Sequence, residues 1–158
     1  MYLLSRVKGF LDNQQIPYIH HVHRTAYTAQ EVAAEEHIPG KVMAKTIVLK
    51  VGKGLALAVV PASLRLDLEA ARALVGDREA RLASELEFTG LFADCDVGAM
   101  PPFGNLYGVP VYVDSALAQD EEIVFNAGTH QDTIRMKYAD FERLARPHVG
   151  NLSLNRAA

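Results

Sequence analysis

Two neighbouring stretches of apolar residues give the first indication of the fold. Residues 42–50 are mostly apolar, and residues 55–60 form a second apolar run that ends at Pro61. The segment between them contains Gly52 and Gly54, which is typical of a tight turn. The pattern therefore predicts two strands joined as a β-hairpin, with antiparallel pairing near the centre of a sheet.

Helical periodicity and capping residues predict helices around this hairpin. Apolar positions three and four residues apart predict amphipathic helices over residues 3–11 and 138–146. Three further helix starts are marked by polar residues that can accept the first backbone hydrogen bonds, namely Thr28, Asp67 and Ser84. These signals place helices both before and after the hairpin.

Other segments predict strands that do not alternate strictly with the helices. They are residues 18–22, 111–113, 122–125 and 133–136, with a short connector over residues 115–119. We therefore expect a mixed α/β fold in a single domain over residues 1–158, and not a doubly wound sheet.

The amino-acid composition is that of a globular protein. Of the 158 residues, 49% are hydrophobic and 22% are charged, which is ordinary for a globular chain able to bury a core. No apolar run reaches the ~20 residues of a membrane-spanning helix. Residues 1–6 lack the long apolar core of a signal peptide. We expect a cytoplasmic protein with no membrane contact.

The net charge limits the nucleic-acid partners. The chain has a formal net charge of −3, whereas proteins that wrap duplex DNA or RNA are generally basic. We therefore expect no DNA partner and no RNA bound over a large surface. Contact with the end of one strand stays compatible with this charge, because only a few phosphates have to be neutralised.

Cysteine and histidine chemistry is not favoured. Cys95 is the single cysteine, and the carboxylates on either side of it disfavour a thiolate. His21 and His23 would share one face of a strand, with His20 on the other, and could contribute to a zinc site. No further ligand at a recognised spacing completes such a site, so solvated or edge histidines are the favoured interpretation and no metal is expected.

A lysine stands in the first of the two central strands. Lys45 lies between Ala44 and Thr46 at the entrance of the apolar run. A buried lysine is costly to charge, so it must pair, shift its pKa or reach solvent through a cleft. Two interpretations follow: a side chain whose stem is buried while its amine reaches water at the strand end, or a functional cation.

Two glycine-containing loops offer a setting for such a cation. In residues 98–104, glycines allow close approach of the backbone to a ligand and prolines stiffen the loop. Such a loop can bind a carbonyl or carboxylate oxygen through its N–H groups, or it is a structural crossover. The second loop, residues 126–130, ends in His130, which is a general acid–base group, a hydrogen-bond donor or a structural histidine.

Together, these three segments resemble one known family. Lys45 with its neighbours, residues 98–104 and residues 126–130 are similar to the YbaK/ProX superfamily, and the similarity covers nearly the whole chain. This superfamily comprises the free-standing relatives of the editing domain of bacterial prolyl-tRNA synthetases. The resemblance implies a mixed α/β fold around a central, partly barrel-like sheet. It also implies hydrolysis of mischarged tRNA, typically tRNA-Pro carrying a small residue such as alanine or cysteine.

The resemblance also implies roles for particular residues. The invariant lysine of the family falls on Lys45, the glycine and proline of its loop fall on Gly98 and Pro102, and its late histidine falls on His130. We expect Lys45, Gly98 and His130 to be catalytic. The expected substrate-binding residues are Thr46, Met100, Pro102, Phe103, Gly128 and Thr129, with Met100 and Phe103 as walls that exclude larger aminoacyl groups.

The implied chemistry requires no cofactor. Attack by water or a ribose hydroxyl on an activated ester mainly needs stabilisation of the developing oxyanion. The expected partners are the acceptor end of tRNA and a prolyl-tRNA synthetase. Two carboxylates, Asp94 and Asp96, stand just before the loop and would disfavour a nearby phosphate. A non-catalytic module that holds an aminoacyl or nucleotide end, and a hydrolase of another small ester or amide, stay open as alternatives; the presence of Lys45 favours the enzyme.

Overall fold

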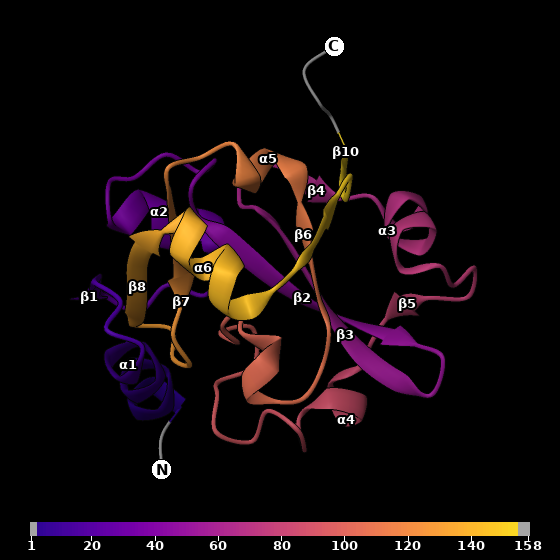
Figure 1. The fold of residues 1–158 in the computed structure, drawn as a ribbon, viewed down its shortest axis with the longest axis horizontal. Helices are drawn as coiled ribbons and strands as arrows, with labels where there is room; N and C mark the ends of the chain where they lie inside the picture. The colour runs from indigo at the N-terminus through magenta and orange to yellow at the C-terminus, as the bar shows by residue number, and fades with distance from the viewer. Residues whose placement is uncertain (1–2, 155–158) are drawn as a thin grey trace.

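The computed structural model describes residues 3–154, so Met1, Tyr2 and residues 155–158 of the expected domain lie outside it. Figure 1 shows helices and strands mixed along the chain. The helices are α1 (Leu3–Asn13), α2 (Ala29–Glu35), α3 (Leu68–Val75), α4 (Glu85–Phe88), α5 (Ser115–Ala118) and α6 (Tyr138–Ala145), with a 3₁₀ turn η1 (Gly104–Leu106). The strands are β1 (Tyr18–Val22), β2 (Ala44–Val51), β3 (Gly54–Pro61), β4 (Arg65–Leu66), β5 (Arg81–Leu82), β6 (Val111–Asp114), β7 (Glu122–Asn126), β8 (Asp132–Lys137), β9 (His148–Gly150) and β10 (Ser153–Leu154).

The two larger sheets meet at one point. The five-stranded sheet has the order β5-β2-β3-β6-β9, in which β5, β2 and β3 pair antiparallel and β6 lies parallel to β3 and β9. The three-stranded sheet, β1-β8-β7, is antiparallel, and β4 pairs with β10. A parallel bridge between Met43 and Val124 joins the larger sheets. These pairings confirm the mixed α/β fold and the predicted hairpin.

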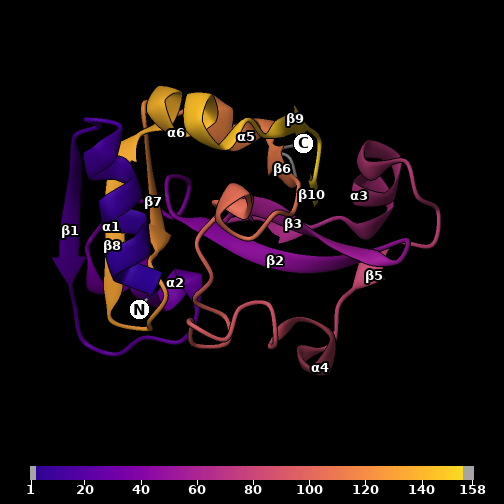
Figure 2. The ribbon, with the colours of Figure 1, turned by 60° about the horizontal axis from the view of Figure 1, so that its bottom comes forward.

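Figures 1 and 2 place the three-stranded sheet and α1 at one end of the molecule and α3 with β5 at the other. The β2–β3 hairpin runs between the two ends. Helix α6 packs against β7 and β8, and α5 lies against β3 and β6. No helix of the described residues is long and apolar enough to cross a membrane.

Capping residues explain where three helices begin. Thr28 Oγ1 accepts a hydrogen bond from the Glu31 N–H at 3.0 Å and starts α2. Asp67 accepts the first N–H groups of α3, which ends at Gly76 in the left-handed conformation. Ser84 forms a capping box at the start of α4. The three helix starts predicted from the sequence are therefore confirmed.

Some short elements were not predicted. Residues 115–119, expected to be a connector, contain α5 because the Asp114 carboxylate accepts a hydrogen bond from the Ala116 N–H and caps the helix. Strands β4, β5, β9 and β10 have two or three residues each. Alternation of apolar and polar residues cannot be recognised over such lengths, so these strands depend on their pairing partners.

An aromatic cluster in the core fixes the segment that follows Gly98. Phe103 is fully buried, and its ring lies edge-on to Phe10, Phe125 and Phe141 at centroid distances of 5.9, 5.5 and 5.3 Å. Such pairs contribute about 0.5–1.5 kcal/mol each beyond the burial of their area. Because its partners belong to α1, β7 and α6, Phe103 anchors the loop to three separate elements.

We expect Gly104→Ala to destabilise the fold by about 1–3 kcal/mol. A β-carbon at Gly104 would overlap the Val109 carbonyl oxygen and lie 2.6 Å from Val111 Cγ2. The matched control is Gly9→Ala in α1, where a β-carbon meets no heavy atom within 4 Å; it should stabilise the protein by up to about 1 kcal/mol. Urea unfolding measures both changes, and equal midpoints would contradict the tight packing at Gly104.

Candidate functional site

A cleft of about 410 Å³ lies beside the first half of β2. Its lining residues are Tyr27, Thr28, Ala29, Gln30, Ala44, Lys45, Thr46, Ile47, Gly98, Met100 and Asn126. Four of the residues predicted from the sequence, Lys45, Thr46, Gly98 and Met100, are therefore brought together. They come from β2 and from the loop of residues 98–104, called the Gly98 loop below, which are far apart in the chain.

Strand pairing leaves this part of β2 accessible. Strand β3 covers one edge of β2 from Ala44 to Val51, whereas β5 pairs with the other edge only at Leu49 and Lys50. Within the described residues, no strand covers that second edge between Ala44 and Ile47. The cleft therefore lies where the sheet is incomplete.

Lys45 is partly buried in the cleft. Its Nζ lies 3.5 Å from the Leu64 carbonyl oxygen. Burial lowers the pKa of Lys45, and the positive charge of Arg65 lowers this pKa further. Because the ammonium is less well solvated than in water, an anion or a polar oxygen in the cleft would stabilise its charged form. Among the lining residues, all of which the structure describes, Lys45 is the single charged one.

Backbone hydrogen bonds hold the Gly98 loop against the turn between β7 and β8. The Asp96 N–H donates to the Gly128 carbonyl at 2.7 Å, and the Gly128 N–H donates to the Ala99 carbonyl at 2.9 Å. The His130 N–H donates to Asp96 Oδ2 at 3.3 Å. Gly98 and Gly128 have φ of +87° and +99°, which other residues rarely adopt. The two glycine-containing loops are thus one structural unit.

His130 stands behind Gly98 and is not among the residues that line the cleft. Its Cε1 would lie 3.6 Å from a β-carbon at Gly98, and its ring packs on Tyr27 at a centroid distance of 4.9 Å. Its Nδ1 is buried and has no hydrogen-bond partner among the described residues. From this position His130 supports two walls of the cleft, so shaping the site fits its geometry better than direct proton transfer.

Four of the predicted substrate-binding residues do not line the cleft, and their role in binding substrate stays a prediction. Pro102 and Phe103 are buried, and the Phe103 ring is a member of the aromatic core, so Met100 alone of the two expected walls faces the cleft. Gly128 and Thr129 shape the β7–β8 turn, where Thr129 Oγ1 donates to Asp132 Oδ2 at 2.7 Å. These four residues build the frame of the site.

Four polar residues of the lining, Tyr27, Thr28, Gln30 and Asn126, were not among the predicted site residues. Gln30 donates from Nε2 to the Ala62 carbonyl at 3.1 Å and ties the start of α2 to the end of β3. Tyr27 is 68% exposed at the rim, and Asn126 is only 7% exposed. The available signals were an aromatic residue directly before the N-cap of α2 and a carboxamide at the end of an apolar strand.

The remaining reactive groups lie elsewhere. Burial raises the pKa of Cys95 to about 12, which disfavours a thiolate at neutral pH, as the sequence predicted. His20 and His21 lie on the edge strand β1, and His21 is exposed, as expected. His23 is buried, with its Nε2 3.5 Å from Glu36 Oε2, so the expectation of a solvated or edge histidine is wrong for this residue. Asp94 is held by Arg6 at 2.6 Å. Within residues 3–154, no group of three or more His, Cys, Asp or Glu could hold a metal ion.

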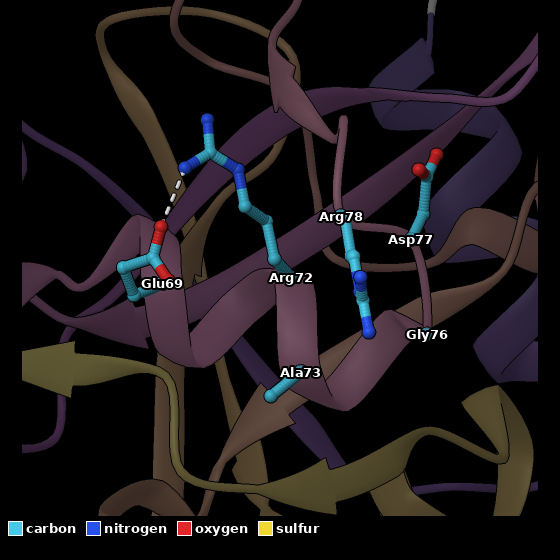
Figure 3. A pocket seen from close by; sticks show the side chains of 6 residues that line it. All are labelled: Glu69, Arg72, Ala73, Gly76, Asp77 and Arg78. Carbon is cyan, nitrogen blue, oxygen red and sulfur yellow. Dashed lines mark hydrogen bonds and ion pairs between the residues drawn. The ribbon is translucent and has the colours of Figure 1, made fainter.

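A larger hollow of about 570 Å³ lies beside α3 (Figure 3). Three of its four charged groups are paired locally: Arg72 lies 2.7 Å from Glu69, and Asp77 accepts the N–H groups of Gly52 and Glu79. It contains none of the predicted site residues. The cleft at Lys45 is therefore the stronger candidate, because it joins a cation, a positive-φ glycine and an apolar wall in one place.

Solved structures support the fold. A structure described as a candidate trans-editing enzyme for prolyl-tRNA synthetase matches 96% of this chain with 96% of its own length, at 27% identity and a TM-score of 0.82. A structure described only as a hypothetical protein matches 94% of this chain with 99% of its own length, at 19% identity and a TM-score of 0.84. The second likeness shows the fold alone.

Curated relatives and a family profile carry the comparison to function. The chain is 35% identical over 113 residues to the multifunctional Ser/Thr-tRNA deacylase ProXp-y of Escherichia coli K12, which covers 68% of this chain and 67% of that relative. A profile of the aminoacyl-tRNA editing domain matches residues 23–144, which include Lys45, Gly98 and His130. These matches confirm the resemblance to YbaK-type proteins and the expected class of enzyme, an aminoacyl-tRNA deacylase. The chain belongs to the aminoacyl-tRNA editing domain family.

Proposed function

We propose that this protein acts in trans on mischarged tRNA and hydrolyses the ester that joins a small amino acid to the terminal ribose. The observation that carries the proposal is the position of Lys45, a partly buried cation beside Gly98 in a cleft with no other charged side chain among its described lining residues. Such a cation stabilises negative charge, which develops on the ester carbonyl oxygen as the nucleophile attacks.

The roles of the three expected catalytic residues follow from their places. Lys45 binds the carbonyl oxygen or the phosphate of the terminal nucleotide. Gly98 lets the backbone approach the ester, because only a hydrogen occupies its side-chain position. His130 holds the Gly98 loop and Tyr27 in place through the contacts described above. Water or a neighbouring ribose hydroxyl supplies the nucleophile.

The substrate we propose is tRNA-Pro or a related tRNA carrying a small residue. Met100 and the half-buried stretch of β2 limit the cleft, so a larger aminoacyl group is excluded by steric overlap. Alanine and cysteine are the residues that the family resemblance implies. The Ser/Thr-tRNA deacylase named among the relatives adds serine and threonine to this set. The likeness to a candidate trans-editing enzyme for prolyl-tRNA synthetase supports a partnership with that synthetase. We also propose that residues 1–158 form one domain.

One assay separates this proposal from its alternatives. The protein is incubated with tRNA-Pro charged with alanine, cysteine, serine or threonine, and with correctly charged prolyl-tRNA, and loss of the ester is followed for each. We expect release of one or more small residues and no release of proline. Binding without release would indicate a non-catalytic module. Release from small esters that lack tRNA, at equal efficiency, would indicate a general esterase.

We expect Lys45→Ala to lower the deacylation rate by about 10²–10³-fold while the protein stays folded. The reason is the loss of a preorganised charge at the developing oxyanion. Lys50→Ala is the matched control, since Lys50 is on the same strand but donates to the Lys53 carbonyl in the hairpin turn; it should keep wild-type activity. Single-turnover deacylation measures both variants. Near-wild-type turnover of Lys45→Ala would overturn the mechanism.

Gly98→Ala should reduce activity by on the order of 10²-fold. The β-carbon would enter the space beside His130, and φ of +87° is unfavourable for alanine. Gly108→Ala tests the strain alone, because Gly108 has φ of +70° and no heavy atom within 4 Å of a β-carbon. Both variants should lose a similar amount of stability, about 1–2 kcal/mol. Turnover and thermal midpoint are measured on the same preparations; full activity of Gly98→Ala would remove this loop from the site.

Binding of tRNA should be weak and sensitive to salt. An acidic chain can neutralise few phosphates. Lys45 lines the cleft and Arg65 is close enough to lower its pKa, whereas Lys41 is paired with Asp120. We expect the logarithm of the binding constant to fall with the logarithm of salt concentration at a slope that reflects roughly two to four phosphate contacts. Fluorescence titration between low and physiological salt gives this slope. A slope near zero would point to a small-molecule substrate.

A further inference from the structure

We propose that Asn126 binds the α-ammonium group of the aminoacyl ester through its side-chain carbonyl oxygen. This inference rests on the proposed deacylation and adds a residue to it: Lys45 holds the oxygens of the ester, and Asn126 holds the amino group on the other side of the reacting carbon.

The first support is an incomplete hydrogen bond. Asn126 lines the cleft and is 7% exposed, and its Oδ1 is buried with no hydrogen-bond partner among the described residues. Buried polar atoms are almost always hydrogen-bonded in folded proteins, so an unpaired carbonyl in a residue that lines a cleft is an acceptor that a bound ligand can satisfy. No hydrogen bond of residues 3–154 fixes the amide nitrogen either. A half-turn of the carboxamide can therefore bring the oxygen to the cleft, since its two ends have the same shape.

The second support is the register of the sheets. Met43, directly before β2, and Val124 on β7 face each other in a parallel bridge. Lys45 and Asn126 each follow by two residues, and side chains two residues apart in a strand point to the same side. Both side chains therefore face the same space, and both line the cleft.

The third support is the charge of the lining. The lining residues, all within the described part of the chain, include no Asp or Glu. An α-amino group has a pKa of about 8, so near neutral pH it is protonated and needs hydrogen-bond acceptors. The Lys45 ammonium can only donate hydrogen bonds. The other carboxamide of the lining, Gln30, is already tied to Ala62. A neutral acceptor also suits the site, because a carboxylate at position 126 would pair with Lys45 and weaken its action on the oxyanion.

The test compares each aminoacyl ester with its analogue that lacks the amino group. tRNA carrying alanine is compared with tRNA carrying propionate, and tRNA carrying serine with tRNA carrying 3-hydroxypropionate. Each kcat/KM is divided by the rate of uncatalysed hydrolysis. We expect the wild type to prefer the amino esters by about tenfold to a hundredfold, which is the usual worth of a hydrogen bond to a charged group. Asn126→Ala should lose this preference and leave the rates on the analogues nearly unchanged.

Asn126→Asp provides the matched variant, because it keeps the shape and an acceptor oxygen. We expect it to retain the preference for amino esters even where its absolute rates fall. Absence of a preference in the wild type, or an equal loss on esters with and without the amino group in Asn126→Ala, would overturn the inference. So would a loss on seryl-tRNA that spares alanyl-tRNA, since the residue would then read the side-chain hydroxyl. If Asn126→Ala does not fold, the wild-type preference and Asn126→Asp decide. A wild type that releases no amino acid from any tRNA would instead refute the deacylase function itself.

Discussion

The place of the site depends on the seam where the two larger sheets meet. Met43 on the β2 side and Val124 on β7 form a single parallel bridge, and the Val124 N–H donates to the Val42 carbonyl at 3.0 Å. Both side chains are buried in the cluster that packs α2 against the sheets. Pairing stops after this bridge, and the cleft lies along the residues that follow on each strand, from Ala44 on β2 and at Asn126 on β7. The bridge thus sets the register in which these residues of β2 and β7 face the cleft.

Burial at this seam disfavours the charged form of Lys45. Burial and Arg65 both lower the pKa of Lys45, and its near neighbour is one carbonyl at 3.5 Å. A well-packed apolar residue would suit the strand better, so the lysine makes sense as a group whose stabilisation is completed by a ligand. The same argument applies to the unpaired side-chain carbonyl of Asn126, a residue that lines the cleft.

The parts of the fold that could be predicted from the sequence are those specified by local rules. The hairpin around Gly52, the Asp67 cap and the capping box at Ser84 depend on neighbouring residues, and they were predicted correctly. The two-residue strands, the burial of Phe103 and the position of Asn126 depend on contacts with distant segments, which periodicity does not encode. For the site, the sequence identified the unusual lysine and the positive-φ glycine. It could not separate residues that line the cleft from those, like Thr129, that hold the frame.

The Gly98 loop, residues 98–104, contains both residues that line the cleft and residues that hold its frame. Gly98 and Met100 face the cleft, while Phe103 and Gly104, a few residues later, are in the core. The Phe103 ring ties the segment to α1, β7 and α6, and the backbone bonds of Asp96 and Ala99 to Gly128 tie it to the β7–β8 turn. The loop is therefore fixed at both ends and cannot shift as a flexible loop would. A shift of about 1 Å in a catalytic arrangement can cost 10²-fold in rate. In the mechanism proposed above, the aromatic core around Phe103 would therefore act through the position it gives to Gly98, although none of its rings lines the cleft.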